Sequence, residues 1–310
     1  MDHSPRERLL GIGFCLSAAV LWSLPPVVMR YLSSALDPYT MNFYRYGCGA
    51  VFITGAVLVR RGRILARLRP YWKGVLFVAF PNVIHQTAWA ASIALRYVPP
   101  AFSALLERAT VPMSVILSFI FLADERRVIR RPVYLAGLSV ALAGMVGLAF
   151  APAVGGESRS VVGIVLVLIA AATWAWYLLQ VKISLEQLDS ATAFCGVSVV
   201  TAIALGVICF VWGEPKRVLA LSSFDHFVLI STGIACIGVA HTIYYAAQKR
   251  LGIAAAVVTY LISPLLTAIW SRWWFGEEFT VIDACFGLML LSGSTVIFYT
   301  RDREVAPAAE

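Results

Sequence analysis

The sequence predicts an all-α integral membrane protein with ten transmembrane helices, arranged as two inverted five-helix repeats. Two observations lead to this fold class. Hydrophobic residues make up 60% of the 310 residues, charged residues make up only 14%, and the mean hydropathy is +0.81, which is too apolar for a soluble domain of this length. The chain also matches itself at a distance of 152 residues, with five apolar segments in each copy.

The internal match keeps one register from the first apolar segment to the ninth. It aligns Gly11-Ile12 with Gly163-Ile164, Trp22 with Trp174, Leu36-Asp37 with Leu188-Asp189, Pro112 with Pro264, and Glu125 with Glu277. An odd number of spans in each copy makes the second copy enter the membrane from the opposite side, which is the inverted-repeat plan of secondary transporters. The pattern therefore indicates alternating access.

The individual helices follow from the length of apolar sequence that crosses a bilayer, about 20 residues. Segments of this length lie near 10–31, 39–59, 74–96, 100–122, 131–151, 161–182, 191–212, 225–248, 252–274 and 280–300. Pro99-Pro100 separates the third segment from the fourth. The first segment has no small-residue cleavage site, so we expect a retained helix rather than a signal peptide.

These helices define two domains and a tail. We expect the first repeat over 8–151, the second over 160–301, and a disordered tail over 302–310. The connections are short and leave no room for an extramembrane enzyme domain.

The basic residues predict the orientation of the chain. With a cytoplasmic N-terminus, the inner connections receive seventeen lysines and arginines and the outer connections receive six. The positive-inside rule therefore places both termini in the cytoplasm. The formal net charge of +8 does not indicate a nucleic-acid partner, because these residues are spread as orientation signals rather than gathered on one face.

Several motifs give the chain a family resemblance. They are AAVLWS at 18–23 with its counterpart AAATWAW at 170–176, FYRYG at 43–47, ALRYVPPAFSALL at 94–106, Pro112, Glu125 and the glycine-rich segment from Gly137 to Gly147. Over about residues 8–300 the chain resembles the drug/metabolite transporter superfamily, in particular its EamA-type members. The resemblance implies a ten-helix exporter or exchanger of small metabolites, often amino acids, in a bacterial inner membrane. It also implies a central cavity between the repeats.

The chain departs from the family pattern at two places. Helix 4 of the family is usually apolar where this chain has Glu107-Arg108, and Val197 in the second repeat offers no counterpart for Arg45. These departures concern the residues that we expect to recognise the substrate.

Three charged residues fall at membrane depth, namely Arg45, Glu107 and Arg108. Such charges are costly and should face the bundle interior or a wet cavity. Arg45 and Glu107 both lie roughly 10–12 Å below the outer helix ends, so they can meet as a pair. Arg108 either points at a neighbouring helix or bends toward the same water. The net positive charge suits a substrate carboxylate, and the alternative is a structural ion pair between helices 2 and 4.

Other polar side chains share helix faces with these charges. Ser103, Glu107, Thr110 and Ser114 form one stripe on helix 4, which we expect to line the cavity. His85 with Trp89 on helix 3, and His241 with Tyr245 on helix 8, can bind substrate or change protonation during transport. The alternative role for each histidine is an interhelical hydrogen bond.

Aromatic residues and prolines complete the predicted site. Trp22 and Trp174 lie deep in their helices and either line the cavity or pack against small residues. Trp270, Trp273 and Trp274 lie near an outer helix end and are typical of the interfacial aromatic belt. The residues that can act as hinges between the two access states, or as static kinks, are Pro25, Pro26, Pro112 and Pro264.

The sequence does not indicate an enzyme. We find no catalytic constellation, metal-ligand cluster or phosphate-binding loop, and no cofactor is implied. The predicted partners are a small-molecule metabolite and membrane lipid, while the oligomeric state stays open because glycines pack helices within or between chains. The leading function is export of metabolites such as amino acids. The alternatives are uptake or exchange of nucleosides or other metabolites, and a non-transporting membrane sensor or scaffold.

Overall fold

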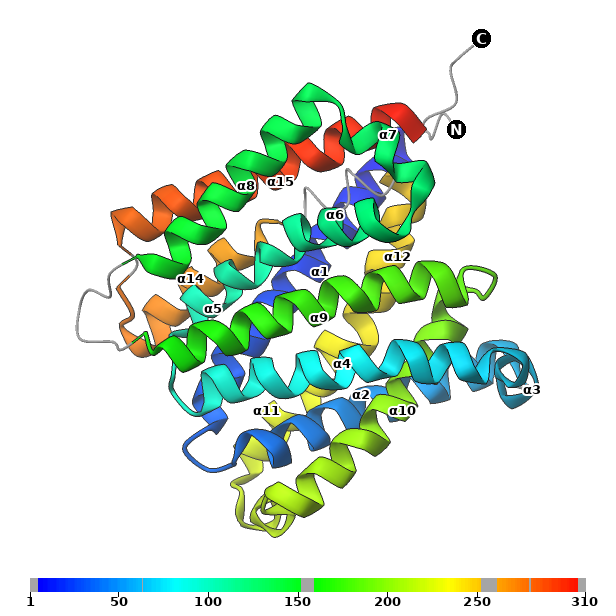
Figure 1. Ribbon diagram of the computed structural model, residues 1–310. Coiled ribbons are helices and arrows are strands. Elements are labelled where there is room, and N and C mark those ends of the chain that lie inside the picture. Colours follow the sequence, from blue (N-terminus) through cyan, green and yellow to red (C-terminus); the bar gives the residue numbers. More distant parts are fainter. Residues whose placement is uncertain (1–4, 63, 152–158, 252–260, 279, 306–310) are drawn as a thin grey trace.

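The computed structural model describes residues 5–62, 64–151, 159–251, 261–278 and 280–305 (Figure 1). Every regular element in these ranges is helical. Seven helical stretches are long and apolar enough to cross a membrane, namely Arg6–Leu32, Pro100–Phe121, Pro132–Phe150, Val161–Leu185, Ser190–Trp212, Ser223–Tyr244 and Val281–Thr300. The chain is therefore a multi-pass membrane protein.

The first half contains eight α-helices and three short 3-10 segments, the latter labelled η. In chain order these are α1 (Pro5–Leu32), α2 (Pro38–Arg61), α3 (Ile64–Leu68), η1 (Arg69–Tyr71), α4 (Trp72–Ala94), α5 (Pro100–Leu106), η2 (Glu107–Ala109), α6 (Thr110–Phe121), η3 (Ala123–Glu125), α7 (Arg126–Ile129) and α8 (Pro132–Phe150). The described elements of the second half are α9 (Val161–Leu185), α10 (Ser190–Trp212), η4 (Pro215–Ala220), α11 (Ser223–Thr232), η5 (Gly233–Val239), α12 (Ala240–Leu251), α14 (Ser263–Phe275) and α15 (Val281–Val305).

The 152-residue register is visible in the local structure of helix starts. Asp37 caps α2 by accepting hydrogen bonds from the backbone N–H groups of Tyr39 and Thr40. Its register counterpart Asp189 caps α10 by accepting from the N–H of Thr192 at 3.1 Å. An aspartate at this position satisfies N–H groups that a helix start leaves unpaired.

Two predicted helices are interrupted. The stretch predicted at 100–122 is divided into α5, η2 and α6, with the tight 3-10 turn one turn before Pro112. Proline lacks an N–H and its ring crowds the carbonyl four residues earlier, here that of Arg108, which explains the position of the break. The stretch predicted at 225–248 contains the π-helical segment η5, so its side chains do not follow one regular α-helical face.

The other predicted hinges differ from Pro112. Pro25 and Pro26 lie inside α1, which is continuous from Pro5 to Leu32. Pro264 lies in the first turn of α14, a position where its missing N–H costs no helical hydrogen bond. The first part of the helix predicted at 252–274 lies outside the described residues up to 260, as does the tail from 306 onward. A kink matching that at Pro112 is therefore not found at Pro264 in the described part.

The helices of the two halves pack in pairs (Figure 1). α2 packs on α10 and α8 on α15, and these pairs relate register counterparts. Three further couples of large contacts match each other: α4 on α9 corresponds to α12 on α1, α6 on α9 to α14 on α1, and α4 on α10 to η5 on α2. These main pairings are kept when each helix is exchanged with its counterpart 152 residues away, whereas the smaller contacts of α4 with α1 and α2 have no counterpart of similar size among the described residues.

Glycines set the distance between α8 and α15. A Cβ atom added at Gly144 would meet the backbone of Phe286 and Leu290, and one added at Gly293 would meet the backbone of Gly137 and Ala141. These small residues therefore bring two helices of the same chain into backbone contact. Gly137, Gly144 and Gly293 thus pack helices within one chain.

We expect Gly144→Ala to destabilise the protein by about 1–3 kcal/mol, because the added methyl group forces the backbones of α8 and α15 apart. Gly13→Ala is the matched control, since nothing lies within 4 Å of a Cβ at Gly13 and alanine favours the helix. Thermal unfolding in detergent measures both. Equal melting temperatures for the two variants would contradict the close packing.

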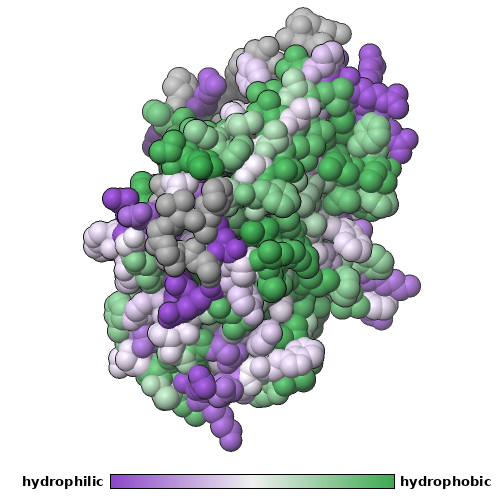
Figure 2. Space-filling view, turned by 60° about the vertical axis from the view of Figure 1, so that its left-hand side comes forward, coloured by the Kyte–Doolittle hydropathy of each residue, from purple (hydrophilic) through white to green (hydrophobic). Residues whose placement is uncertain are grey.

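The surface suits a bilayer. Figure 2 shows hydrophobic side chains over much of the upper and right-hand part of the visible face, while many of the hydrophilic side chains lie at its edges and lower end. Large apolar side chains are exposed on several helices, among them Val59 at 89%, Phe77 at 62% and Phe210 at 70%. Contact with lipid, rather than water, accounts for such exposure.

Candidate functional site

Arg45 lies in the middle of the bundle on α2. It follows the Asp37 cap by eight residues, roughly 12 Å along the helix, and is only 3% exposed. Its face of α2 meets η5 closely, because Cβ atoms added at Gly49 and Gly233 would collide with η5 and with the Arg45 carbonyl, respectively. The Arg45 Nε has no hydrogen-bond partner among the described residues, and neither has the Nδ2 of Asn42 one turn earlier. α2 thus presents two buried donors.

The predicted pairing of Arg45 with Glu107 is wrong. The ion pair of Glu107 is with its chain neighbour, since Arg108 Nη2 lies 2.6 Å from Glu107 Oε2. Both residues belong to the 3-10 turn η2, and the flexible arginine side chain bends back to reach the adjacent carboxylate. No ion pair joins Arg45 to Glu107 in the described part of the chain.

The polar stripe predicted on the helix at 100–122, which the structure divides into α5, η2 and α6, faces the interior. Ser103, Glu107 and Thr110 are 0%, 5% and 7% exposed, and the Ser114 hydroxyl is buried as well. The Thr110 hydroxyl lies within donating distance of the Ala171 carbonyl on α9, at 3.2 Å, and of Glu107 Oε1, at 3.4 Å. The hydroxyls of Ser103 and Ser114 have no partner among the described residues, so they are available to a ligand or water.

An aromatic cluster joins α4 to α9. The His85 ring stacks on Trp89, with ring centroids 5.7 Å apart, and lies 4.8 Å from the Trp174 ring, which stacks in turn on Tyr177. The Nδ1 atom of His85 is 3.0 Å from the Ala170 carbonyl, which can only accept, so this nitrogen carries the proton. The histidine therefore makes the interhelical hydrogen bond that was one of its two predicted roles, within a wall of aromatic rings.

A second aromatic cluster joins α1 to α12. The Trp22 ring meets His241 and Tyr244 edge to face, each at 4.9 Å, and His241 stacks on Phe194 at 4.3 Å. The Trp22 indole N–H donates to the Cys236 carbonyl of η5 at 2.8 Å. The backbone of Tyr245 lies in α12, but its side chain is outside the described residues.

The two clusters are related by the internal register. Trp22 corresponds to Trp174, and His241 corresponds to Trp89. Each cluster therefore places a tryptophan from the first helix of one copy against a ring from the third helix of the other. The structure therefore places the predicted aromatic residues in two equivalent clusters. One contains Trp22 and His241, and the other contains His85, Trp89 and Trp174.

Three features were missed in the sequence. The first is a buried bidentate ion pair between Arg159 and Asp283, for which the cap motif Thr280-x-x-Asp283 was the available signal. The second is a buried hydrogen-bond centre in which the Asn82 amide donates to Tyr46 and Thr201. No local pattern indicates this contact, because three helices contribute to it.

The third is an apolar cavity of about 140 Å³ near the C-terminal end of α1, lined by Leu24, Val27, Val28, Tyr31, Val228, Trp270, Trp273 and Trp274. Trp273 and Trp274 are 75% and 49% exposed, as expected for an interfacial belt. Trp270 differs, because its indole N–H donates inward to the Ser23 hydroxyl at 3.0 Å.

The two register-related glutamates connect helices. Glu125 pairs with Lys182 at the end of α9, with Nζ to Oε1 at 2.7 Å. Glu277 is 5% exposed and accepts a long hydrogen bond, 3.5 Å, from the Ala101 N–H at the start of α5. Each of these glutamates therefore connects a residue at a helix end to another helix.

Comparison with known proteins identifies the family. Residues 9–150 and 161–299 each match the EamA-like transporter family. The chain is 24% identical over 270 residues to the uncharacterized inner membrane transporter YhbE of Escherichia coli (strain K12), covering 84% of this chain and 80% of the relative. It is 22% identical over 307 residues to an uncharacterized transporter of Clostridium kluyveri, covering 95% and 94%.

A solved crystal structure shares the fold, with a TM-score of 0.65 at 17% identity, and the match covers 98% of this chain and 100% of that one. Both relatives are named as transporters. The resemblance seen in the sequence motifs is confirmed over nearly the whole length, and the chain belongs to the EamA-like transporter family.

Proposed function

We propose that the protein is a secondary transporter that exports small metabolites such as amino acids by alternating access. In this proposal ten transmembrane helices form two inverted five-helix repeats, and the substrate binds between the repeats near Arg45. The protein resides in a bacterial inner membrane with both termini in the cytoplasm.

The pairing of helices supports the inverted repeats. The main pairings that survive the exchange of each helix with its register counterpart support a pseudo-two-fold relation between the halves. In Figure 1, α1 and its counterpart α9 run in opposite directions along the bundle. Antiparallel counterparts require the axis to lie in the membrane plane, which is the arrangement that supports alternating access in secondary transporters.

The position of basic residues supports the orientation. α1 begins and α15 ends at the same end of the bundle, where α3 and α7 also lie (Figure 1). The segments at α3 and α7 carry the basic residues Arg67, Arg69, Arg126, Arg127 and Arg130. The positive-inside rule assigns this end to the cytoplasm.

The observation that carries the substrate proposal is the buried Arg45 guanidinium. A charge at membrane depth needs a partner, and the ion pair of Glu107 with Arg108 leaves Arg45 without one in the described part of the chain. A carboxylate of an amino acid or organic acid would supply the missing charge and accept from Arg45 Nε and Asn42 Nδ2. The aromatic walls around Trp22, His85, Trp89, Trp174 and His241 would contact apolar or cationic parts of the substrate.

Counterflow in proteoliposomes tests the function. Vesicles holding the purified protein are preloaded with a mixed amino-acid pool, and uptake of each labelled amino acid is compared with protein-free vesicles. Saturable exchange is the expected result, and efflux from inside-out and right-side-out vesicles then gives the direction. Exchange of nucleosides but not amino acids would favour the uptake or exchange alternative. An absence of flux with amino acids, nucleosides and organic acids would favour a sensor or scaffold.

A further inference from the structure

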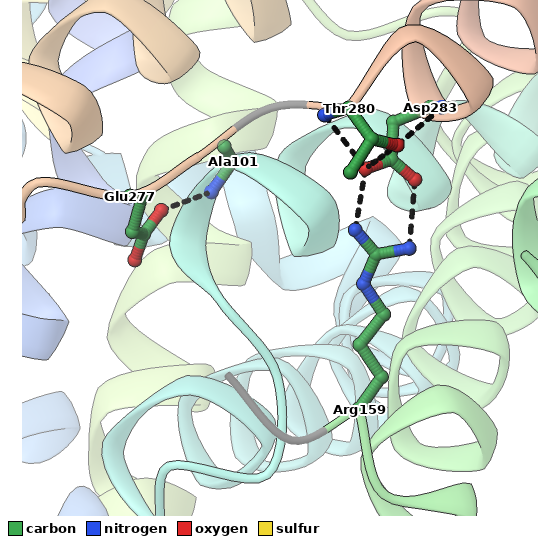
Figure 3. A network of polar contacts seen from close by, with 5 residues as sticks. All are labelled: Ala101, Arg159, Glu277, Thr280 and Asp283. Atoms are coloured by element: carbon green, nitrogen blue, oxygen red, sulfur yellow. Dashed lines mark hydrogen bonds and ion pairs between the residues drawn. The ribbon is translucent and has the colours of Figure 1, made fainter. Parts of the chain in front are cut away.

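Arg159 and Asp283 form a deeply buried ion pair between the segment before α9 and the start of α15. Arg159 Nη1 lies 2.7 Å from Asp283 Oδ1 and Nη2 lies 2.5 Å from Oδ2, a bidentate arrangement shown in Figure 3. The two side chains are 7% and 0% exposed. Bidentate charge-assisted hydrogen bonds of this kind are both strong and specific in geometry.

The Asp283 carboxylate is held in place by the start of α15. Its Oδ2 accepts from the Thr280 hydroxyl at 2.9 Å, while the Asp283 N–H donates to that hydroxyl at 3.0 Å. This reciprocal capping holds the carboxylate in the orientation in which it contacts Arg159 (Figure 3). The ion pair therefore connects a rigid helix start to the residue two positions before α9.

The same network extends to α5. The Arg159 guanidinium lies 4.4 Å from the Phe102 ring centroid, and the backbone N–H of the preceding Ala101 donates to Glu277. The Ser160 N–H, next to Arg159, donates to the Tyr97 carbonyl just before α5 at 2.9 Å. Second-half residues thus hold the start of α5, the helix that leads into the charged turn η2.

The opposite end of α9 carries a second, weaker connection. Lys182 pairs with Glu125, which follows α6, but the two side chains are 46% and 12% exposed. The stretch from α5 to α6 is therefore joined to α9 near both ends, with the 3-10 break at Glu107–Ala109 between them. In alternating access the two ends of this stretch must part from α9 at different times.

We propose that Arg159, Asp283 and Phe102 form the outer gate of the transporter. The ion pair and the ring contact hold the start of α5 against α9 and α15 when the site is closed to the outside. They separate when the site opens outward, and the Lys182–Glu125 pair is the inner counterpart. This inference rests on the proposed alternating access, and its test needs no substrate.

Accessibility of a thiol at the start of α5 tests the gate. Ser103 is fully buried on the interior stripe, so Ser103→Cys provides a reporter, in a background where the exposed Cys285 is replaced by serine. A membrane-impermeant maleimide is added outside right-side-out vesicles, and labelling at position 103 is followed by peptide mass spectrometry. Asp283→Asn should raise the labelling rate by about tenfold, because it removes the charge-assisted pair while keeping the shape of the side chain.

Arg217→Gln is the matched control. It breaks an exposed ion pair, in which the Arg217 and Glu214 side chains are 53% and 61% exposed, and leaves the Arg159–Asp283 pair and its cap intact, so labelling should stay near the unsubstituted rate. Lys182→Gln breaks the inner connection instead and should lower labelling from outside. If Asp283→Asn does not fold, Arg159→Lys serves in its place, since it keeps the charge but loses the bidentate contact and should give a smaller rise.

Two outcomes would overturn the gate: unchanged labelling in folded Asp283→Asn or Arg159→Lys protein, or an equal rise with Arg217→Gln. Either would reduce the pair to a structural contact of α15. The two proposals can also fail separately. If labelling changes as expected but no counterflow is found, the proposed substrates are wrong, whereas the gate is still supported.

Discussion

Replacing Arg45 by alanine is expected to reduce substrate exchange by at least about tenfold, since a charge-assisted hydrogen bond to a carboxylate contributes roughly 1.5–3 kcal/mol. The variant should fold, because the Arg45 Nε has no protein partner to lose in the described part of the chain. Counterflow rates at several substrate concentrations measure the effect. Arg45→Lys should retain part of the activity, since it keeps the charge but not the planar group of donors.

The control for this change is Arg272→Ala, which removes an exposed arginine near an outer helix end and should leave exchange unchanged. Full exchange by folded Arg45→Ala protein would show that the buried guanidinium does not recognise the substrate. The same assay with methyl esters of active substrates gives a further check. If Arg45 binds a carboxylate, esters should not compete.

Arg108→Gln is expected to destabilise the protein by about 3–5 kcal/mol, because it leaves the buried carboxylate of Glu107 without its counter-charge. The double substitution Glu107→Gln with Arg108→Gln should recover much of this loss, since both charges are then absent. The wild type, the two single variants and the double variant form a double-mutant cycle. Unfolding each of the four proteins in detergent, by heat or by denaturant, gives the coupling energy of the pair.

An exposed pair provides the comparison. Arg217 contacts Glu214 at 2.7 Å with side-chain exposures of 53% and 61%, so Arg217→Gln should change stability by less than about 0.5 kcal/mol. Exchange by the recovered double variant separates the two roles of the buried pair. Normal exchange would make Glu107 and Arg108 structural, whereas lost exchange in a stable protein would place them in substrate recognition. A fully stable Arg108→Gln protein would contradict the importance of the pair.

The polar residues on α5, η2 and α6 show which features of the site could be predicted from the sequence and which could not. Their spacing correctly placed Ser103, Glu107 and Thr110 on the interior, because a helical period is a local property. The partner of Glu107 was not predictable in the same way. It depends on the 3-10 turn before Pro112, which changes the angle between neighbouring side chains and lets Arg108 reach the carboxylate.

Helix 8 gives a second example. One regular α-helix was predicted over 225–248, whereas the structure divides this stretch into α11, the π-helical segment η5 and α12. Its carbonyl at Cys236 accepts the indole N–H of Trp22, 214 residues away in the chain. The periodicity of one helix does not predict which residues of another helix will lie beside it. The hydrogen bond by which Trp22 connects α1 to η5 could therefore be identified only from the fold.

From the sequence alone we could predict that the protein lies in a membrane, that it contains an internal duplication, and which family it resembles. Apolar composition, a fixed register and ordered motifs are properties of the linear chain, and they survive any detail of packing. Only the tertiary structure decided which charges pair, which rings stack, and that Arg159 meets Asp283 beside Phe102. Those contacts join residues from different helices or depend on local departures from helical geometry, so distance in space, rather than spacing in sequence, selects the partners.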